Sequence, residues 1–360
     1  MRVKILAGDL GTSLNARIKP LCTYLKQRNI DCQVILPIDW RAIVKRFSKV
    51  ANILSVLLTF PPEKLINLLL NDDFDVLIVN RISTHLISLV LKRLKRKTKI
   101  VFDLNDALFL KMSKFLGINM RPGSFALERI IIDSDFVTVN GHFLLGYVSI
   151  FNNNADIIHD PIDTELFSPA HKKKTDIITI GWEGNARVHY ENLKMLVNPL
   201  RKLAKKYDLR FKIVSYLGDR RIKCLFKKLE KLMKIDYGSA TWLPPDKHAE
   251  LIYDFDIEVA PLKKSLWNEG KSALRVGIGM AMGIPVVASP VGEQKYVIKH
   301  GDNGFLAKND DDWYRYLKLL IEDDELRKLM GKKGRETAEK VLSLRANGAK
   351  LYKILQTLLS

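Results

Sequence analysis

The sequence predicts an α/β protein built from two facing Rossmann-like domains, and three observations support this fold class. The 360 residues are enough for about two domains. Short runs rich in β-branched residues alternate with amphipathic stretches in both halves, the pattern of parallel α/β units. The apolar periodicity lapses at residues 160–176, where two prolines and a lysine run are typical of a linker.

The elements follow in order along the chain. In the first half we expect strands at residues 3–7, 32–36, 76–79, 99–102, 136–139 and 156–158. In the second half we expect them at 177–180, 211–214, 240–242, 257–260, 285–288 and 305–307. Helical patterns cover 83–94, 191–206, 219–234, 272–282 and 342–359. We therefore expect an N-terminal domain at 1–165, a second domain at 166–341, and a C-terminal helix at 342–360 that packs back towards the first domain.

The charge and the cysteine content narrow the function classes. A net charge of +19 favours an anionic partner, which is a membrane surface, a nucleic acid or a phosphorylated substrate. The basic residues are not interleaved with aromatic ones, and no known module appears, so we expect no nucleic acid partner. The three cysteines are too few and too scattered for a disulfide framework or a metal site, which indicates a reducing cytoplasm and no bound metal.

Two facing Rossmann-like domains place a cleft between the carboxyl ends of their strands, so chemistry belongs in the loops that follow the strands. In the first domain, "GDLGTS" offers Gly8, Gly11 and Thr12 as an anion-binding turn, although a plain strand-to-helix turn fits as well. Arg81 follows the third strand and suits a phosphate, a carboxylate or a structural ion pair.

"FDLNDA" places two carboxylates at the end of another strand in the first domain. Asp103 comes directly after the strand, a position suited to acid–base work on a substrate. Asp106 lies further into the loop, and there we favour a helix cap. Of the two, we therefore expect Asp103 to be the catalytic residue.

In the second domain, "GWEGNARVHYENL" follows the strand at 177–180. Gly184 frees the backbone, Asn185 is placed to cap the next helix, and Arg187 lies beside the helix N-terminus, which favours a phosphate. His189 is assigned a packing role.

The richest loop is "APLKKSLWNEGKSALR". Four cations surround Trp267 and Glu269, namely Lys263, Lys264, Lys271 and Arg275. Gly270, Lys271 and Ser272 open a helix where backbone N–H groups and a lysine can hold a phosphate together. The loop lacks the first glycine of a Walker A motif. The alternative is a solvated basic loop. The helix that follows is apolar nearly all round apart from Arg275, so we expect it to be buried.

These stretches resemble the GT-B glycosyltransferases, and within them the retaining glycosyltransferase family 4, or glycosyl transferases group 1. "IDTELFSP" at 162–169 is similar to the family's linker. "DIEVAPLKKS" and "GKSALRVGIGMAMGIPVVASPVGEQKYVIKHGDNGFLA" are similar to its donor-site core. The resemblance covers most of the second half, and the first half only loosely, through "RIKPLCTYL" and "FDLNDA".

The resemblance implies that the second domain holds a nucleotide sugar as substrate, without a cofactor. Lys271 matches a residue that binds the donor phosphates, Arg275 a second basic residue, and Gly292 and Glu293 a loop near the donor sugar. The family commonly carries two glutamates eight positions apart, which correspond to Gly270 and Ile278 here. Glu269 lies one place from the first position, and nothing nearby replaces the second.

The implied activity is metal-independent sugar transfer with retained configuration, in surface polysaccharide or glycoconjugate synthesis. Lys271, Arg275 and the helix N-terminus near Asn185 would stabilise the departing diphosphate. A glycan or lipid-linked acceptor would lie near Gly8–Ser13 and Arg81. The alternative is a catalytically degenerate subunit that binds a partner protein or an anionic glycan, because Gly270 and Ile278 replace the two glutamates.

Residues 40–60 predict a further helix with a wide apolar face. Its narrow polar stripe is bordered by basic residues, Arg41, Lys45, Arg46 and Lys49, and a second basic run surrounds Lys95. This pattern fits a helix that lies in the surface of an anionic membrane, and equally a helix buried against a sheet. We expect a cytoplasmic protein that is peripheral on the inner leaflet of the cytoplasmic membrane.

Overall fold

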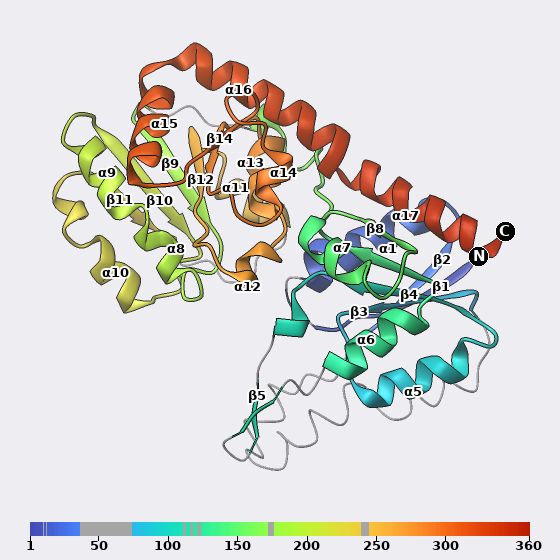
Figure 1. Ribbon diagram of the computed structural model, residues 1–360. Helices are drawn as coiled ribbons and strands as arrows, with labels where there is room; N and C mark the ends of the chain where they lie inside the picture. The colour runs from blue at the N-terminus through green and yellow to red at the C-terminus, as the bar shows by residue number, and fades with distance from the viewer. Residues whose placement is uncertain are drawn as a thin grey trace. The chain divides into compact units, whose positions relative to one another are not determined.

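The computed structural model contains two compact units, and each is described here by itself (Figure 1). The first comprises Met1–Pro161, Gly270–Ser272 and Leu344–Ser360, and the second comprises Ile162–Glu269 and Ala273–Ser343. The structure describes residues 1–9, 11, 13–36, 74–110, 113–115, 118–120, 124–171, 176–238 and 245–360.

The first unit is a parallel six-stranded sheet in the order β2-β1-β3-β4-β7-β8. Its strands are β1 (Arg2–Leu6), β2 (Asp31–Ile35), β3 (Val76–Asn80), β4 (Lys99–Leu104), β7 (Phe136–Val139) and β8 (Ala155–Ile157), and β5 (Ser113–Phe115) and β6 (Ile118–Met120) form a separate antiparallel pair. Its helices are α1 (Lys19–Lys26), α5 (His85–Leu94), α6 (Ser124–Asp133), α7 (His142–Val148) and α17 (Leu344–Leu359). α17 packs on α1 and adds Leu351 and Leu355 to the core beside the sheet.

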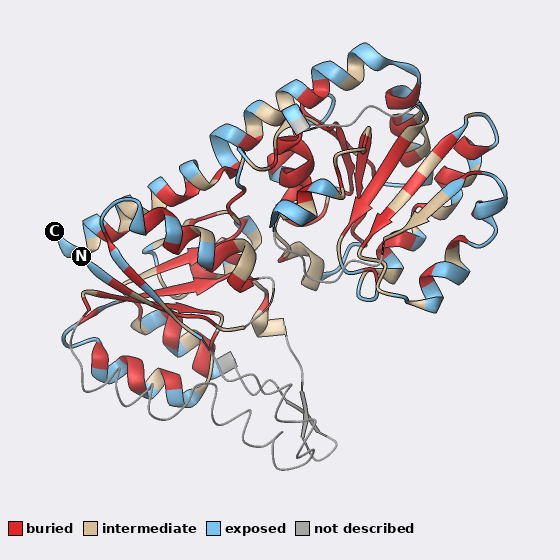
Figure 2. Ribbon diagram, turned by 180° about the vertical axis from the view of Figure 1, so that it is seen from behind, coloured by how far each residue is buried: buried red, intermediate tan, exposed pale blue. Residues whose placement is uncertain are grey.

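The second unit is a parallel six-stranded sheet in the order β11-β10-β9-β12-β13-β14. Its strands are β9 (Ile178–Glu183), β10 (Leu209–Val214), β11 (Lys234–Tyr237), β12 (Ile257–Ala260), β13 (Val286–Ala288) and β14 (Phe305–Leu306). Its helices are α8 (Tyr190–Lys194), α9 (Val197–Ala204), α10 (Arg220–Phe226), α11 (Pro245–Glu250), α12 (Leu266–Glu269), α13 (Leu274–Ala281), α14 (Gln294–Val297), α15 (Asp310–Glu322) and α16 (Asp324–Thr337). In both units the central strands are buried on both faces (Figure 2), as is typical of parallel sheets covered by helices.

The predicted fold class is confirmed, with two parallel sheets and their covering helices. Two local predictions are wrong. The helix expected at 191–206 is two helices, because a new helix, α9, begins at Val197 and carries Pro199 in its first turn, where a missing N–H costs least. The helix expected at 219–234 ends early, and its last residue belongs to the edge strand β11. The strand expected at 240–242 lies outside the described residues.

Candidate functional site

The second unit gathers its polar loops at the carboxyl ends of three neighbouring strands. β9, β12 and β13 run side by side in parallel, so the loops that follow them emerge at one edge of the sheet. A pocket of about 550 Å³ opens among the segments after β9, β10 and β12. Its lining includes four cations and a large aromatic ring: Arg187, Arg221, Lys263, Lys264 and Trp267. Such a lining suits an anionic ligand that carries a planar group.

Gly184 and Arg275, both predicted to bind the donor, lie against each other in this unit. Gly184 has a φ of +134°, and a Cβ on it would lie 2.5 Å from Nη2 of Arg275. The Arg275 guanidinium lies 4.9 Å from the ring centroid of Trp182 and donates from Nε to the backbone carbonyl of Glu183. A glycine at 184 is therefore required both by the backbone conformation and by the close approach of this cation.

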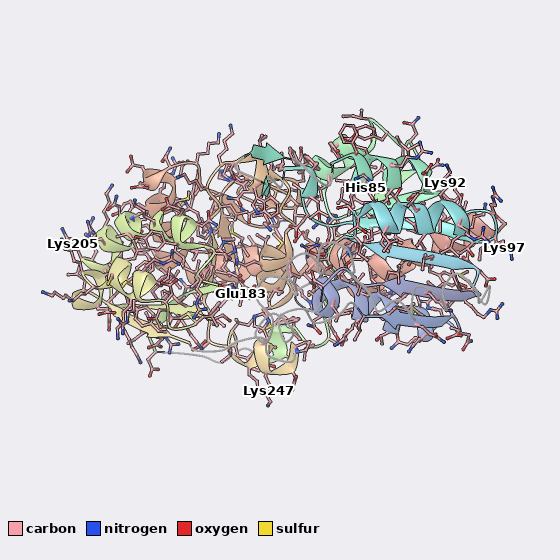
Figure 3. The ribbon with its side chains drawn as sticks, turned by 90° about the horizontal axis from the view of Figure 1, so that it is seen from below. His85, Lys92, Lys97, Glu183, Lys205 and Lys247 are labelled. Atoms are coloured by element: carbon pink, nitrogen blue, oxygen red, sulfur yellow. The ribbon has the colours of Figure 1, made fainter. Side chains whose placement is uncertain are left out.

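Two carboxylates, Glu183 and Glu258, lie near Arg275, and His248 pairs with the first of them; the sequence prediction included none of the three. Glu183 ends β9 (labelled in Figure 3), and its carboxylate accepts a hydrogen bond from Nε2 of His248 on α11 at 2.7 Å. Glu258 lies in the middle of β12, fully buried, and neither of its carboxylate oxygens has a hydrogen-bond partner among the described residues. The sequence signal for Glu258 was a single acidic residue inside the apolar run "IEVA".

Asn185 and Arg187 form a turn after β9. The predicted helix cap at Asn185 is wrong: its side chain accepts from the backbone N–H of Arg187 at 3.1 Å, and α8 begins later, with His189 as its first flanking residue. Asn185 forms an Asx turn instead of a helix cap because its side chain bonds to the backbone N–H two residues further on. Arg187 donates from Nη2 to the carbonyl of Leu217 at 2.9 Å, so it is held at the wall of the pocket.

Glu269 ties the loop after β12 to the loop after β13. Its carboxylate accepts from the backbone N–H of Gly292 at 3.2 Å and pairs with Lys295 at 2.8 Å. Gly292 has a φ of +67°, a conformation that favours glycine, and the adjoining Glu293 is 2% exposed. The structure thus brings Glu269 and Gly292 together, with Glu293 next to them in the chain, and their binding of a donor stays a prediction.

Ile278, which stands where the family commonly has a glutamate, is a core residue. It is 5% exposed and lies in an apolar cluster with Val276, Met280 and Ile284. The face of α13 that carries Ile278 is therefore dry, and this position offers no polar contact to a ligand.

The stretch Gly270–Ser272 belongs to the first unit, where it meets a chain of charges. Lys271 pairs with Asp106 at 3.0 Å, Asp106 pairs with Arg81 at 2.8 Å, and Arg81 pairs with Asp9 at 2.6 Å. Asp106 is thus an ion-pair partner of two cations. Arg81 has a φ of +58°, which is uncommon for a residue with a side chain, and the ion pairs hold it there.

The loop after β1 lies close to β3. A Cβ on Gly8 would overlap the carbonyl oxygen of Asn80 at 2.3 Å, so glycine is required for this approach. The N–H of Gly11 donates to the carboxylate of Asp9 at 2.8 Å, and that carboxylate also pairs with Arg81. Thr12, the third predicted acceptor residue of this loop, lies outside the described residues.

Asp103 is the centre of a buried network in the first unit. It is 3% exposed, and its oxygens accept from Nε and Nη2 of Arg17, from Thr138 at 2.6 Å and from Asn80 at 2.8 Å. Burial would raise the pKa of Asp103, but Arg17 and the two neutral donors lower it below its ordinary value. Its catalytic role stays a prediction, and these contacts establish that it anchors three separate elements of the unit.

No helix in the described ranges is long and apolar enough to cross a membrane. Within the same ranges, no three or more His, Cys, Asp or Glu side chains are grouped so that they could hold a metal ion.

Comparison with known proteins gives a family-model match, a related sequence and two similar solved structures. Residues 177–323 match the family model of the glycosyl transferases group 1. MJ1178 of Methanocaldococcus jannaschii, an uncharacterized glycosyltransferase, is 31% identical over 239 residues, or 66% of this chain and 62% of that protein. The chain thus matches about three fifths of the length of this relative.

Two solved structures are similar over nearly the whole chain. A glycosyltransferase from Rickettsia africae has a TM-score of 0.72 at 15% identity and is matched over 100% of this chain and 98% of its own. Alr3699/HepE from Anabaena, solved in complex with UDP, has a TM-score of 0.67 at 12% identity over 99% of this chain and 100% of its own. At such identities the likeness shows a shared fold.

Proposed function

We propose that this chain, a GT-B protein whose residues 177–323 match the family model of the glycosyl transferases group 1, transfers a sugar from a nucleotide-sugar donor to a glycan or lipid-linked acceptor. The observation that carries the proposal is the guanidinium of Arg275. It is fixed by Trp182 and the Glu183 carbonyl, and its Nη1 and Nη2 make no hydrogen bond or ion pair to any described residue. A positioned cation with unused donors suits a diphosphate.

The proposed chemistry places the greatest demand on the leaving diphosphate, which gains negative charge as the bond to the sugar breaks. Arg275 would meet this charge in the second unit, together with the basic lining of the pocket. Binding of the donor phosphates by Lys271 stays a prediction from the sequence. Glu269 would keep the Gly292–Glu293 loop in place, and Gly184, Asn185 and Arg187 would shape the donor site in the second unit. The donor-binding roles of Gly270 and Ser272, which belong to the first unit, stay predictions. Retention of configuration and independence from metal ions belong to the same proposal.

The acceptor side of the proposal rests on the first unit. Gly8, Gly11 and Arg81 lie together at the carboxyl ends of β1 and β3. We assign Asp103 a positioning role here, because Arg17, Thr138 and Asn80 already occupy its oxygens. An acceptor for surface polysaccharide or glycoconjugate synthesis fits a strongly basic protein, since such acceptors are often carried on anionic lipid.

A panel of nucleotide sugars tests the activity. The purified chain is mixed with UDP-, GDP- and ADP-sugars, with and without EDTA, and both its melting temperature and the release of nucleoside diphosphate are measured. Because a ligand that binds only the folded state stabilises it, one nucleotide class should raise the melting temperature. Binding of that class with no release of diphosphate for any sugar, with mixed glycan and lipid-linked acceptors present, would instead identify a binding subunit without activity.

Lys271→Ala checks the donor side of the assignment. Loss of one charged hydrogen bond should weaken binding of the stabilising nucleoside diphosphate by about 10-fold to 100-fold. The unfolding free energy should change little, because Lys271 is part-exposed and its ion pair is of the kind worth about 0–1 kcal/mol. Equal affinity in variant and parent would remove Lys271 from the donor site.

We also propose that the first unit docks on an anionic membrane surface. Arg41, Lys45, Arg46 and Lys49 lie outside the described residues, so the proposal now rests on α5 and α6, which pack on each other. α5 exposes Leu89, and α6 exposes Phe125, whose exposed fraction is 78%. A basic run covers the last turn of α5 and the residues after it: Lys92, Arg93, Lys95, Arg96 and Lys97 (Figure 3 labels Lys92 and Lys97). Exposed apolar side chains and clustered cations are the two signals that together give stable membrane binding.

Flotation with vesicles tests the docking. The parent should float with phosphatidylserine vesicles and not with purely zwitterionic ones, and added salt should reduce binding. Replacing Lys92, Arg93 and Arg96 together by glutamate should abolish flotation. The matched control replaces Lys227, Lys228 and Lys231, exposed residues of the second unit, and changes the net charge equally. Equal flotation of both triple variants would mean that membrane binding depends on the net charge of the protein and not on a docking face formed by α5 and α6.

A further inference from the structure

A buried acid–base cluster in the second unit surrounds the cation on which the proposed donor site depends. Its members come from four elements: Glu183 ends β9, Glu258 lies in β12, His248 belongs to α11 and Arg275 to α13. His189, just before α8, lies near enough to Glu183 to act on its charge. The sugar transfer proposed above uses only Arg275 from this group.

Glu183 and His248 form a close pair. His248 Nε2 lies 2.7 Å from the carboxylate, and both side chains are largely withdrawn from water, with 27% of His248 and 9% of Glu183 exposed. Burial would raise the pKa of Glu183, but the pair lowers it. Burial would lower the pKa of His248, but Glu183 raises it above its ordinary value. While His248 is charged, most of the negative charge of Glu183 is therefore already matched.

Glu258 differs from Glu183 because it has no hydrogen-bond partner among the described residues. It is fully buried, and its carboxylate passes so close to α13 that a Cβ on Gly279 would lie 2.0 Å from Oε2. Burial, and next the charge of Glu183, raise the pKa of Glu258 well above its ordinary value, although Arg275 opposes this. A carboxyl group in this position therefore favours its neutral form.

The neighbours of Arg275 therefore leave its charge largely unmatched. Its only hydrogen bond to a described residue goes to a backbone carbonyl, and one carboxylate beside it is paired with His248. The other, Glu258, is buried without a hydrogen-bond partner among the described residues, which favours its neutral form. We infer that Glu183, His248 and Glu258 are positioning residues that set how much of the charge of Arg275 is available to a diphosphate ligand. This inference rests on the proposed function, because it concerns the regulation of the same donor site.

The direction of the expected pH dependence follows from the loss of a proton by Glu258 and by His248. As the pH rises, Glu258 loses its proton and its new charge matches that of Arg275. Over the same change, His248 loses its proton and frees the charge of Glu183, and any charge on His189 is lost in the same direction. Each step makes Arg275 less attractive to an anion, so affinity for a diphosphate should fall with rising pH.

Titration of diphosphate binding in Glu258→Gln tests the inference. Glutamine has nearly the same shape and cannot ionise, so at high pH the variant should bind UDP and pyrophosphate about tenfold more tightly than the parent, while the two agree at low pH. The matched control is Glu250→Gln on α11, which removes the same charge from a side chain that is 50% exposed. The phosphate groups themselves ionise near pH 6, and comparison between proteins at each pH removes that effect.

The outcomes separate the inference from the function on which it rests. Identical pH profiles for the parent and Glu258→Gln would overturn the inference while leaving diphosphate binding intact. If the parent binds neither UDP nor pyrophosphate at any pH, the proposed function fails. The inference is then judged without ligand, by carbon-13 NMR of labelled carboxyl groups, with Glu258→Gln identifying the signal. A Glu258 signal that titrates in the ordinary range of glutamate overturns the inference, and one that stays protonated to neutral pH supports it.

Discussion

Each unit holds an arginine near the carboxyl ends of its sheet, Arg17 buried and Arg275 part-buried, and the two are held in opposite ways. Arg17 in the first unit is 1% exposed, binds Asp103 through Nε and Nη2, and donates from Nη1 to the Ile158 carbonyl and to Asp160. Arg275 in the second unit makes one hydrogen bond to a described residue and stacks on Trp182. Burial lowers the pKa of both, but the two carboxylates beside Arg17 raise its pKa overall, whereas the pKa of Arg275 stays lowered.

This difference separates a cation whose donors are all used by the fold from a cation whose unused donors are available to a ligand. A buried charge with all its donors used is part of the fold, and removing it leaves its partners unmatched. A buried charge with unused donors is costly to the fold, and a ligand that supplies the missing acceptors gains the difference. The two arginines therefore predict opposite balances between stability and binding.

Arg17→Met should show the largest effect of the variants considered. It leaves Asp103 buried with only Thr138 and Asn80, and breaking a buried ion pair costs about 3–5 kcal/mol. Urea unfolding of the parent, of Arg17→Met and of the exposed control Arg93→Met measures this cost. A loss below about 1 kcal/mol would mean that Arg17 is not the anchor of the first unit.

Acid should weaken the same network. The pKa of Asp103 is lowered in the folded state, so its contribution to stability is present above its unfolded pKa, about 3.9, and is lost as the pH falls through the lower folded value. Arg17→Met should accordingly lose this component of the acid dependence, and unfolding midpoints measured at several pH values below neutral check it.

Ile278→Glu should show the next largest effect. The side chain is 5% exposed among apolar neighbours, so the new carboxyl group would be buried without a partner, in the helix that already covers Glu258. We expect a loss of about 2–4 kcal/mol and no gain in nucleotide affinity. Leu329→Glu on α16, whose side chain is 52% exposed, is the matched control. Improved binding of a nucleoside diphosphate by Ile278→Glu would show that this position faces a ribose after all.

The sequence predicted most of the scaffold because its signals are local. β7 and β12 begin and end at the residues expected, since each is a short apolar run bounded by polar residues. β11 was missed because Lys234–Tyr237 is an edge strand in which charged and apolar residues continue the preceding helical pattern. Arg275 was predicted as a site residue because it is one of the four cations of "APLKKSLWNEGKSALR" and matches a second basic residue of the family's donor site.

The buried partners could not be predicted because they depend on contacts between distant segments. Arg17 and Asp103 are 86 positions apart, and nothing local marks them as a pair. Glu183 and His248 meet only because α11 packs beside the end of β9. Glu258 was visible as a charge within an apolar strand, but its lack of a partner appears only once the strand is buried against Gly279.

Calorimetric titration of UDP into Arg275→Met tests the central claim most directly. Methionine keeps the apolar contact with Trp182 and removes the charge, so the free energy of unfolding should change by only about 1 kcal/mol while UDP affinity falls by about 10-fold to 100-fold. Arg315→Met, in which an exposed arginine of α15 is replaced, should bind like the parent. A variant at Arg275 that binds UDP as tightly as the parent, or that unfolds as readily as Arg17→Met, would contradict the account of Arg275 as a cation held for a diphosphate.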